Sequence, residues 1–184
     1  PYSEYDNILS TGEQVTSALL AIALERLNLR TRSWLGWQIP IVTDNTYGKS
    51  VIEKIETDNI LTSLEHNEVA VVSGFQGVSS ENKITTLGRG GSDTTAVAMA
   101  AAFSADRCDI YTDVDGVYTT DPRIVKRAKK LDIITYEELL ELASQGAKVL
   151  QARSVALAMK YEVNLRVLSS FANLPGTSII NEGN

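Results

Sequence analysis

Short strand-like runs alternate with helix-like runs along this chain, and this alternation constrains the fold more than any other feature. The clearest strand, residues 68–73 (Glu-Val-Ala-Val-Val-Ser), is short and rich in valine, and it ends at Gly74. Apolar strands without alternating polar positions are typical of parallel sheets that are buried on both faces. Residues 94–105 are then predicted as an alanine-rich helix and 108–112 as the next strand. This order predicts an α/β fold, a three-layer αβα sandwich with a mainly parallel open sheet.

Periodicity and capping residues predict the remaining elements. Ser10 and Thr11 are the expected N-cap of a helix over 12–27, whose apolar side chains recur at helical spacing. The run Thr135-Tyr136-Glu137-Glu138 fits a capping box for a helix that reaches about Gln145, with Gly146 just beyond it. The other expected elements are a strand at 30–35, a short helix within 57–65, a loop at 77–82, a helix at 151–161, a strand at 165–169 and a turn at 175–176.

Composition excludes several classes of protein. The chain of 184 residues can bury a sizeable core as one domain. Its net charge of -6 has the wrong sign for binding nucleic acid through phosphate neutralisation. A single cysteine excludes an internal disulfide, and a single histidine excludes a histidine-rich zinc site. The longest apolar run, 96–103, is too short to span a bilayer, so we expect a cytoplasmic protein without membrane contact.

Two apparent ligand motifs fail on spacing. Gly48-Lys49-Ser50 looks like the end of a P-loop, but Thr43 stands where that motif needs its first glycine. The run 113–116 (Asp-Val-Asp-Gly) looks like the start of a calcium loop, but Ile124 occupies the twelfth position, where the bidentate glutamate belongs. We therefore predict neither a P-loop nor a metal site formed by protein ligands.

The run Gly88-Arg89-Gly90-Gly91-Ser92-Asp93 has the physical character of an anion site. Glycines let backbone N–H groups approach a ligand closely, and the positive end of the helix that follows lies at the same place. The Arg89 guanidinium adds a planar fork that suits a carboxylate or a phosphate. The run does not match the dinucleotide-binding pattern, because Asp93 occupies the position of its last glycine. A tight turn capped by Ser92 or Asp93 is the alternative interpretation.

A second group of polar residues follows the strand at 108–112. Asp113, Asp115 and Asp121 come after its carboxyl end, where open α/β sheets bind their ligands. Solvated turn acids are the alternative, and they suit Asp121 better than Asp113. Lys148 could offset a helix dipole or meet a phosphate, and Glu13 lies in a first helical turn, where an acid is favoured in any case.

Six motifs, in order, resemble those of the aspartate kinases, members of the amino-acid kinase superfamily. The most specific are 85–96, around Gly-Arg-Gly-Gly-Ser-Asp, and 110–118, around Asp-Val-Asp-Gly-Val-Tyr, which runs on into Asp121-Pro122-Arg123. The others are Ser10-Thr11-Gly12-Glu13, Gly74-Phe75-Gln76-Gly77, Gly146-Ala147-Lys148-Val149-Leu150 and Pro175-Gly176-Thr177. Together these motifs cover nearly the whole chain.

The resemblance implies transfer of the ATP γ-phosphoryl group to the side-chain carboxylate of L-aspartate, with Mg²⁺ held mainly by the ATP phosphates. This reaction is the first step towards lysine, methionine and threonine. The implied substrate-binding residues are Glu13, Arg89, Gly90, Gly91, Ser92 and Asp93. The implied nucleotide-binding residues are Thr112, Asp113, Tyr118, Arg123 and Lys148, and Asp93 and Lys148 are the implied catalytic residues. A carboxylate nucleophile is already ionised at neutral pH, so this chemistry needs no general base.

The sequence departs from the family pattern at both ends. It contains no Lys-Phe-Gly-Gly loop, and it stops before the regulatory ACT domains of the family. We therefore expect a partial kinase domain over 1–184, with substrate binding at about 1–105 and nucleotide binding at about 106–184. We also expect this chain to be inactive alone and the intact enzyme to be a homo-oligomer.

Two alternatives remain open. The first is another kinase of the superfamily, with glutamate, acetylglutamate or a nucleotide monophosphate as its acceptor. The second is a non-catalytic module that binds ATP or partner subunits without transferring phosphate. A change of acceptor in one assay separates the first from an aspartate kinase, and ATP binding without ADP release identifies the second.

Overall fold

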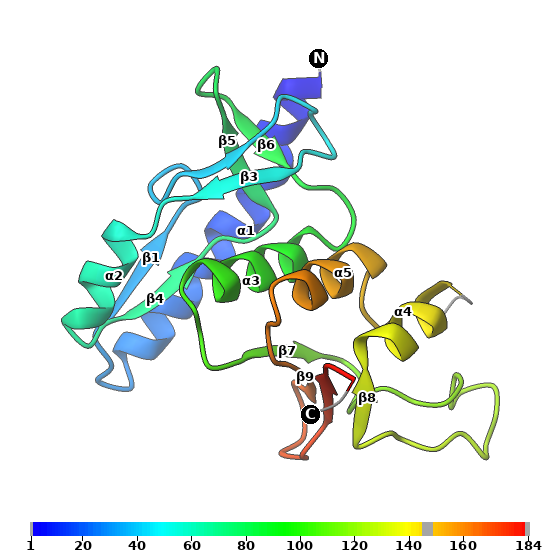
Figure 1. Cartoon of the computed structure of the whole chain (residues 1–184). Coiled ribbons are helices and arrows are strands. Elements are labelled where there is room, and N and C mark those ends of the chain that lie inside the picture. Colours follow the sequence, from blue (N-terminus) through cyan, green and yellow to red (C-terminus); the bar gives the residue numbers. More distant parts are fainter. Residues whose placement is uncertain (1, 145–148, 183–184) are drawn as a thin grey trace. The chain divides into compact units, whose positions relative to one another are not determined.

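The computed structural model describes residues 2–144 and 149–182, which form two compact units, Pro1–Thr95 and Ala96–Asn184 (Figure 1). Both units combine helices with strands, which confirms the predicted α/β class. Among the described strands, four hydrogen-bonded pairs are parallel and three are antiparallel, and the strands group into three sheets. The boundary between the units falls inside helix α3 (Gly91–Ala102).

Unit 1 contains two sheets and the long helix α1 (Tyr2–Glu25). The first sheet pairs β1 (Thr31–Trp34) in parallel with β4 (Val69–Val72), as the apolar run at 68–73 predicts. The second sheet has the order β3-β2-β5-β6, and its strands were not predicted. Its strands are β2 (Ile41–Thr43), β3 (Ile52–Ile55), β5 (Gln76–Ser79) and β6 (Ile84–Thr86). Helix α2 (Asp58–Glu65) lies between β3 and β4 in the chain.

The expected loop at 77–82 is wrong in its first half, because residues up to Ser79 belong to β5. This strand is buried throughout between β2 and β6, so its neighbours and not its own propensity impose the extended conformation. A Cβ atom at Gly77 would lie 2.5 Å from the carbonyl oxygen of Ile41, so the glycine is required for the strands to approach.

The expected N-cap of α1 is also wrong, because the helix begins at Tyr2 and passes through Ser10 and Thr11. Inside the helix, the Ser10 hydroxyl donates to the Asn7 carbonyl at 2.9 Å and the Thr11 hydroxyl to the Ile8 carbonyl at 2.7 Å. Both hydroxyls are thus satisfied by the preceding turn, as happens for serine and threonine in helix interiors.

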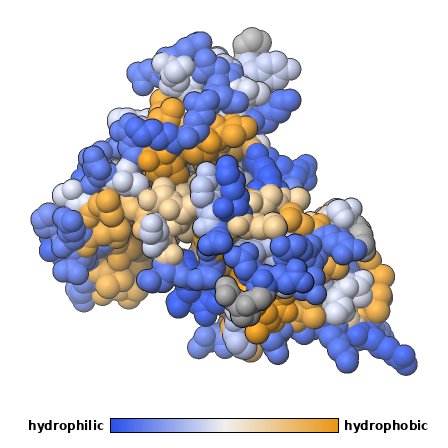
Figure 2. All heavy atoms as spheres, in the orientation of Figure 1, coloured by the Kyte–Doolittle hydropathy of each residue, from blue (hydrophilic) through white to orange (hydrophobic). Residues whose placement is uncertain are grey.

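Helix α1 buries polar residues and exposes apolar ones. Its buried side chains are Asp6, Ser10, Ser17 and Ala21, and the helix contacts β6, β1 and β4 (Figure 1). The large apolar side chains on its outer surface are Tyr2, Tyr5, Ile8, Leu9, Val15, Leu19, Leu20 and Ile22. The periodicity at 12–27 therefore identifies the helix correctly, but its apolar face is not the face that packs on the sheets. Apolar residues also reach the surface over α2 (Figure 2), where Leu61 and Leu64 are exposed.

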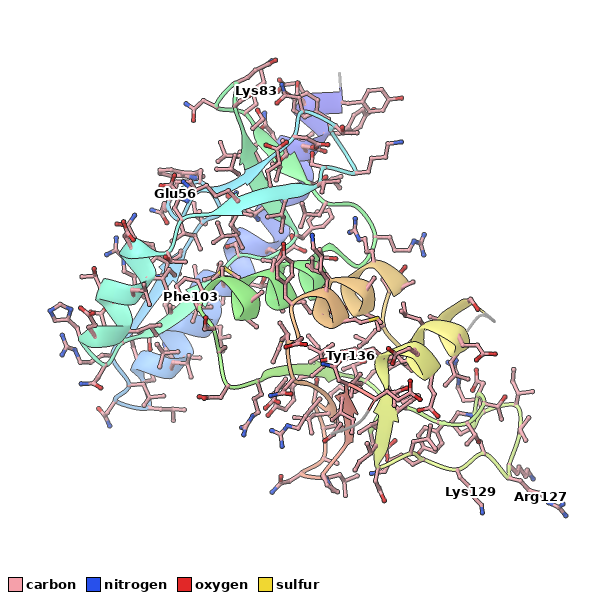
Figure 3. The ribbon with its side chains drawn as sticks, viewed as in Figure 1. Glu56, Lys83, Phe103, Arg127, Lys129 and Tyr136 are labelled. Carbon is pink, nitrogen blue, oxygen red and sulfur yellow. The ribbon has the colours of Figure 1, made fainter. Side chains whose placement is uncertain are left out.

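Unit 2 has one described four-stranded sheet with the order β7-β9-β10-β8. Its elements are β7 (Cys108–Thr112), β8 (Ile133–Thr135), α4 (Tyr136–Ser144), α5 (Ala152–Lys160), β9 (Leu165–Ser169) and β10 (Thr177–Ile180). The inward side chains of these elements and of α3 form one apolar core that includes Val97, Ile110, Val155 and Val167. Tyr136 lies at the start of α4 (Figure 3), and its buried hydroxyl donates to the Val163 carbonyl.

The predicted capping box at α4 is confirmed. The Thr135 N–H donates to Glu138 Oε2 at 2.9 Å, and the Glu138 N–H donates to Thr135 Oγ1 at 3.2 Å. The residues expected to end this helix, Gln145 and Gly146, lie outside the described residues. None of the helices in the described ranges is long and apolar enough to cross a membrane.

An ion-pair cluster on the β7–β9 pair gives unit 2 a pH-dependent contribution to stability. Arg166 donates to both carboxylate oxygens of Asp109, at 2.8 and 2.6 Å, and Arg107 adds a third hydrogen bond at 3.1 Å. The bonds from Arg166 are the main reason that the pKa of Asp109 lies below its ordinary value of 3.8. A lowered carboxyl pKa stabilises the fold above the unfolded-state pKa, and this stabilisation is lost as the pH falls through the folded-state pKa.

We predict that Asp109→Asn lowers the free energy of unfolding at pH 7 by about 0.5–1 kcal/mol, the range of partly exposed ion pairs. The difference from wild type should shrink as the pH falls below 3.8, the ordinary pKa, because the wild-type carboxyl then becomes neutral too. Urea unfolding across this pH range measures both effects. Asp121→Asn is the matched control, because its partner Arg123 is 88% exposed and the pair should add nothing measurable. An Asp109→Asn effect that stays constant with pH would contradict the assignment.

Candidate functional site

The glycine-rich run 88–93 forms the entry to α3, which begins at Gly91, three residues earlier than predicted. Gly88 and Gly90 adopt φ values of 72° and 68°, in the left-handed region that favours glycine. At Gly88, moreover, a Cβ atom would lie 2.8 Å from the Gly48 carbonyl oxygen. Ser92 and Asp93 lie in the first helical turn, where N–H groups have no acceptor within the helix. The turn therefore presents backbone donors, and the helix dipole adds positive potential there.

A pocket of about 330 Å³ opens at this helix start, within unit 1. All six residues of the run 88–93 line it, so the structure brings together Arg89, Gly90, Gly91, Ser92 and Asp93 as predicted. Its remaining walls come from Leu9 on α1, Gly48 between β2 and β3, Phe75 and Thr86. A pocket of this size, with backbone donors and two charged side chains, suits a small charged ligand.

The two charged residues of the pocket differ in burial. The Arg89 side chain is exposed, whereas Asp93 is half-buried in the first turn of α3. Burial raises the pKa of Asp93 above its ordinary value of 3.8, since desolvation disfavours the charged carboxylate. The pocket thus combines an exposed cation, Arg89, with a carboxyl group, Asp93, whose pKa is raised by burial.

Glu13 does not line the pocket, but a short connection links its position on α1 to the pocket. The Ser73 hydroxyl donates to the Glu13 carbonyl at 3.3 Å and shares a 2.7 Å hydrogen bond with the buried Ser17 hydroxyl. Two residues later, the Phe75 N–H donates to Thr95 Oγ1 on α3 at 3.0 Å. The segment 73–75 therefore joins α1 to the first turns of α3. The half-buried Glu13 carboxylate has no hydrogen bond or ion pair with the part of the chain that the structure describes.

Sequence reasoning gave no binding role to the other pocket residues, although Phe75 and Thr86 lie in motifs of the family resemblance, and it missed Asp6, the group that holds two of them. Asp6, 1% exposed on α1, accepts hydrogen bonds from the N–H groups of Thr86 at 2.8 Å and Gly48 at 3.0 Å. Its second oxygen accepts from the Thr86 hydroxyl at 2.9 Å. No local pattern marks an aspartate near a helix start as buried, because its partners lie 42 and 80 residues away in sequence.

In unit 2, the predicted nucleotide residues begin at the carboxyl end of β7. Thr112 is the last residue of this strand and pairs in parallel register with Ser169 of β9, so both strands end at the same edge. The Thr112 hydroxyl donates to Asp113 at 3.1 Å, and the Asp113 side chain is exposed. Polar groups thus gather where parallel strands of α/β sheets bind ligands.

The turn that follows β7 is fixed by buried backbone contacts. The Val117 N–H donates to the buried Thr177 hydroxyl at 2.8 Å, and that hydroxyl donates to the Leu131 carbonyl at 2.5 Å. A Cβ atom at Gly116 would lie 2.5 Å from the same hydroxyl oxygen. Tyr118 leaves this turn half-buried and donates to Asp115 at 2.9 Å, a bond that raises the pKa of Tyr118. The Pro-Gly-Thr motif therefore acts as the anchor of the Asp-Val-Asp-Gly-Val-Tyr turn.

Arg123 lies on the long connection between β7 and β8, five residues after Tyr118. Its guanidinium donates to both oxygens of Asp121, at 3.1 and 2.8 Å, and this pairing lowers the pKa of Asp121. Five lysines and arginines stand between 123 and 130, and Arg127 and Lys129 project outwards from the connection (Figure 3). This loop therefore carries strong positive charge. Lys148, the remaining predicted residue, lies outside the described residues.

Residues 2–144 and 149–182 contain no group of three or more His, Cys, Asp or Glu side chains that could hold a metal ion.

Relatives of known type match nearly the whole chain. It is 58% identical over 176 residues to the aspartate kinase of Pseudomonas fluorescens, covering 96% of this chain and 43% of that protein. The crystal structure of E. coli aspartokinase III with aspartate and ADP superposes with a TM-score of 0.92 at 32% identity, covering all of this chain and 42% of that one. The aspartate kinase structure from Synechocystis gives a TM-score of 0.84 at 45% identity, with 97% and 29% coverage.

These comparisons confirm the resemblance predicted from the motifs. The chain spans less than half the length of the curated relatives that it matches. The model of the Amino acid kinase family matches residues 2–169, which include every candidate residue named above. On its sequence and its fold, this chain belongs to the amino acid kinase family.

Proposed function

We propose that this chain carries the substrate-binding parts of an aspartate kinase, which transfers the γ-phosphoryl group of ATP to the side-chain carboxylate of L-aspartate. The products are ADP and 4-phospho-L-aspartate. One observation above all supports the proposal: residues 89–93, identified from the motif, line a single pocket at the start of α3. The chain covers less than half of its relatives, so the activity proposed here is that of the whole protein.

We assign amino-acid binding to unit 1. The first-turn amides of α3 and the Arg89 guanidinium suit the carboxylates of an amino diacid. Asp93 supplies a negative charge for the ammonium group. We assign Glu13 as a second acid for the same group, because segment 73–75 joins its part of α1 to the first turns of α3. Asp93 also helps to orient the acceptor carboxylate for phosphoryl transfer. A pocket of about 330 Å³ is ample for a ligand the size of aspartate.

We assign nucleotide binding to unit 2. Thr112 and Asp113 offer a hydroxyl and a carboxylate for the polar parts of the nucleotide, and Tyr118 offers an aromatic face with a fixed hydroxyl. Arg123 belongs to a loop whose positive charge favours polyphosphates, and Lys148 is the cation proposed to reach the transferred phosphate. Mg²⁺ would be carried by the ATP phosphates and would neutralise charge during transfer.

The donor set fits phosphoryl transfer to a carboxylate. The acceptor carboxylate needs no deprotonation at neutral pH, so alignment and charge neutralisation suffice. Arginine, lysine, helix amides and glycine-loop amides supply these functions without histidine or cysteine. We further propose that the whole enzyme works in the cytoplasm as a homo-oligomer and opens the route to lysine, methionine and threonine.

We predict that the 184-residue chain binds L-aspartate and, separately, ATP with Mg²⁺ in calorimetric titrations. Arg89→Ala should weaken L-aspartate binding at least tenfold and leave ATP binding unchanged, because it removes a bidentate partner from the amino-acid pocket. Arg30→Ala is the matched control, since its guanidinium is exposed and lies 3.9 Å from Glu68 in a weak pair.

Tighter binding of L-glutamate, N-acetylglutamate or UMP than of L-aspartate would contradict the proposed acceptor, and so would failure to bind any of them. Trapping of the acyl phosphate with hydroxylamine then separates the kinase from the non-catalytic alternative. ATP binding without acyl phosphate in the full-length enzyme would identify a binding module.

A second prediction concerns Asp93, whose pKa is raised because its carboxyl group is partly buried and desolvated. Because the folded-state pKa is higher than the unfolded one, ionisation of Asp93 destabilises the fold as the pH rises. Asp93→Asn should therefore raise the melting temperature at pH 7 by about 2 °C, and the gain should fade towards pH 3.8, the ordinary pKa. The same variant should lose L-aspartate binding. A variant that is less stable at pH 7, or that binds normally, would refute this role.

A further inference from the structure

The buried carboxyl group of Asp6 accepts hydrogen bonds from three neutral donors. It receives the N–H groups of Gly48 and Thr86 and the Thr86 hydroxyl, all within 3.0 Å. Arginine and lysine side chains form no salt bridge with it in the described part of the chain. A buried carboxyl group is tolerated only where hydrogen bonds replace its lost hydration, and here all the replacing donors come from segments outside α1.

The donors to Asp6 belong to two separate walls of the pocket. Gly48 and Thr86 both line it, one from the connection between β2 and β3 and the other from the end of β6. The Ser50 N–H also donates to the Thr86 carbonyl at 2.9 Å, which ties the same two segments. Asp6, Gly48 and Thr86 therefore form a hydrogen-bonded group, which we call the clamp. It joins α1, the loop at 46–50 and the end of β6.

The clamp lies immediately before the residues that bind the ligand. Thr86 precedes Gly88 by two residues, and Gly88 packs so closely on Gly48 that a Cβ atom would lie 2.8 Å from its carbonyl oxygen. A shift of Thr86 or Gly48 would thus move the glycine run directly. The α3 amides and Arg89 must meet a small ligand with sub-ångström accuracy. Loss of the clamp should therefore reduce the free energy of ligand binding more than it reduces the free energy of unfolding.

We propose that Asp6 is a positioning residue of the amino-acid pocket, which acts through Thr86 and Gly48 and does not touch the ligand. The inference rests on the proposed function, since it takes L-aspartate as the ligand of this pocket. It also assigns a role to the polar inner face of α1, because an apolar side chain at position 6 could not hold these donors.

Two variants of Asp6 test the proposal. Asp6→Ala removes every acceptor. Asp6→Asn keeps an oxygen for the two N–H groups and turns an amide donor towards the Thr86 hydroxyl, which can accept. We expect Asp6→Ala to weaken L-aspartate binding at least tenfold, with ATP binding unchanged, and Asp6→Asn to restore affinity to within about threefold of wild type. The matched control is Ser63→Ala, which removes the 2.5 Å hydrogen bond that the buried Ser63 donates to the partly buried Glu68 elsewhere in unit 1. Ser63→Ala should lower stability without changing the affinity for L-aspartate.

Amide hydrogen exchange gives a readout that does not depend on the ligand. Exchange at Gly48 and Thr86 should accelerate in Asp6→Ala and stay slow in Asp6→Asn and Ser63→Ala. Normal L-aspartate affinity in Asp6→Ala would overturn the proposal, and so would equal losses in Asp6→Ala and Asp6→Asn, since charge and not position would then matter. If the wild-type protein binds no L-aspartate, the proposed function is wrong. If amide exchange at Gly48 and Thr86 is unchanged in Asp6→Ala, Asp6 does not hold these two segments and the inference itself is wrong.

Discussion

Close approach of neighbouring segments to the glycines at 88–91 is the constraint on which the pocket depends. Gly88 lies against the Gly48 carbonyl, and a Cβ atom at Gly91 would lie 2.7 Å from the Phe75 ring. These contacts bring the segments around Gly48 and Phe75 to the start of α3, because Gly88 and Gly91 have no side chains to keep them apart. The amides of the first turn of α3 consequently lie at a pocket, where the helix dipole and Arg89 contribute positive potential.

The polar inner face of α1 follows from the same arrangement. Asp6 and Gln76 are both buried, and each is satisfied across the contact between α1 and the second sheet: the Gln76 amide donates to the Ser10 carbonyl at 3.0 Å, and its oxygen accepts from Gln14 at 3.0 Å. Such hydrogen bonds are directional, so they fix the register of the helix on the sheet more strictly than apolar packing would. The outer face of α1 carries the apolar side chains instead.

The features predictable from sequence were those encoded locally. The capping box at Thr135 and Glu138 was predicted because both partners lie within four residues, and the glycine run at 88–93 was predicted because its conformation needs glycine. Strand β5 and the role of Asp6 could not be predicted, because both depend on partners far away in sequence. In β5, the buried Gln76 and Gly77 have no strand propensity of their own, and neighbouring strands impose the conformation. The spacing of apolar residues in α1 correctly predicts a helix, but it does not predict which face of the helix is buried.

The central claim is that the first turn of α3, with Arg89, binds an amino diacid. A crystal structure of this chain with L-aspartate tests it most directly. We expect a carboxylate of the ligand within hydrogen-bonding distance of the amides of Ser92 or Asp93, and the Arg89 guanidinium on a carboxylate of the same ligand. Aspartate bound elsewhere in unit 1, or a pocket that stays empty at saturating aspartate, would contradict it.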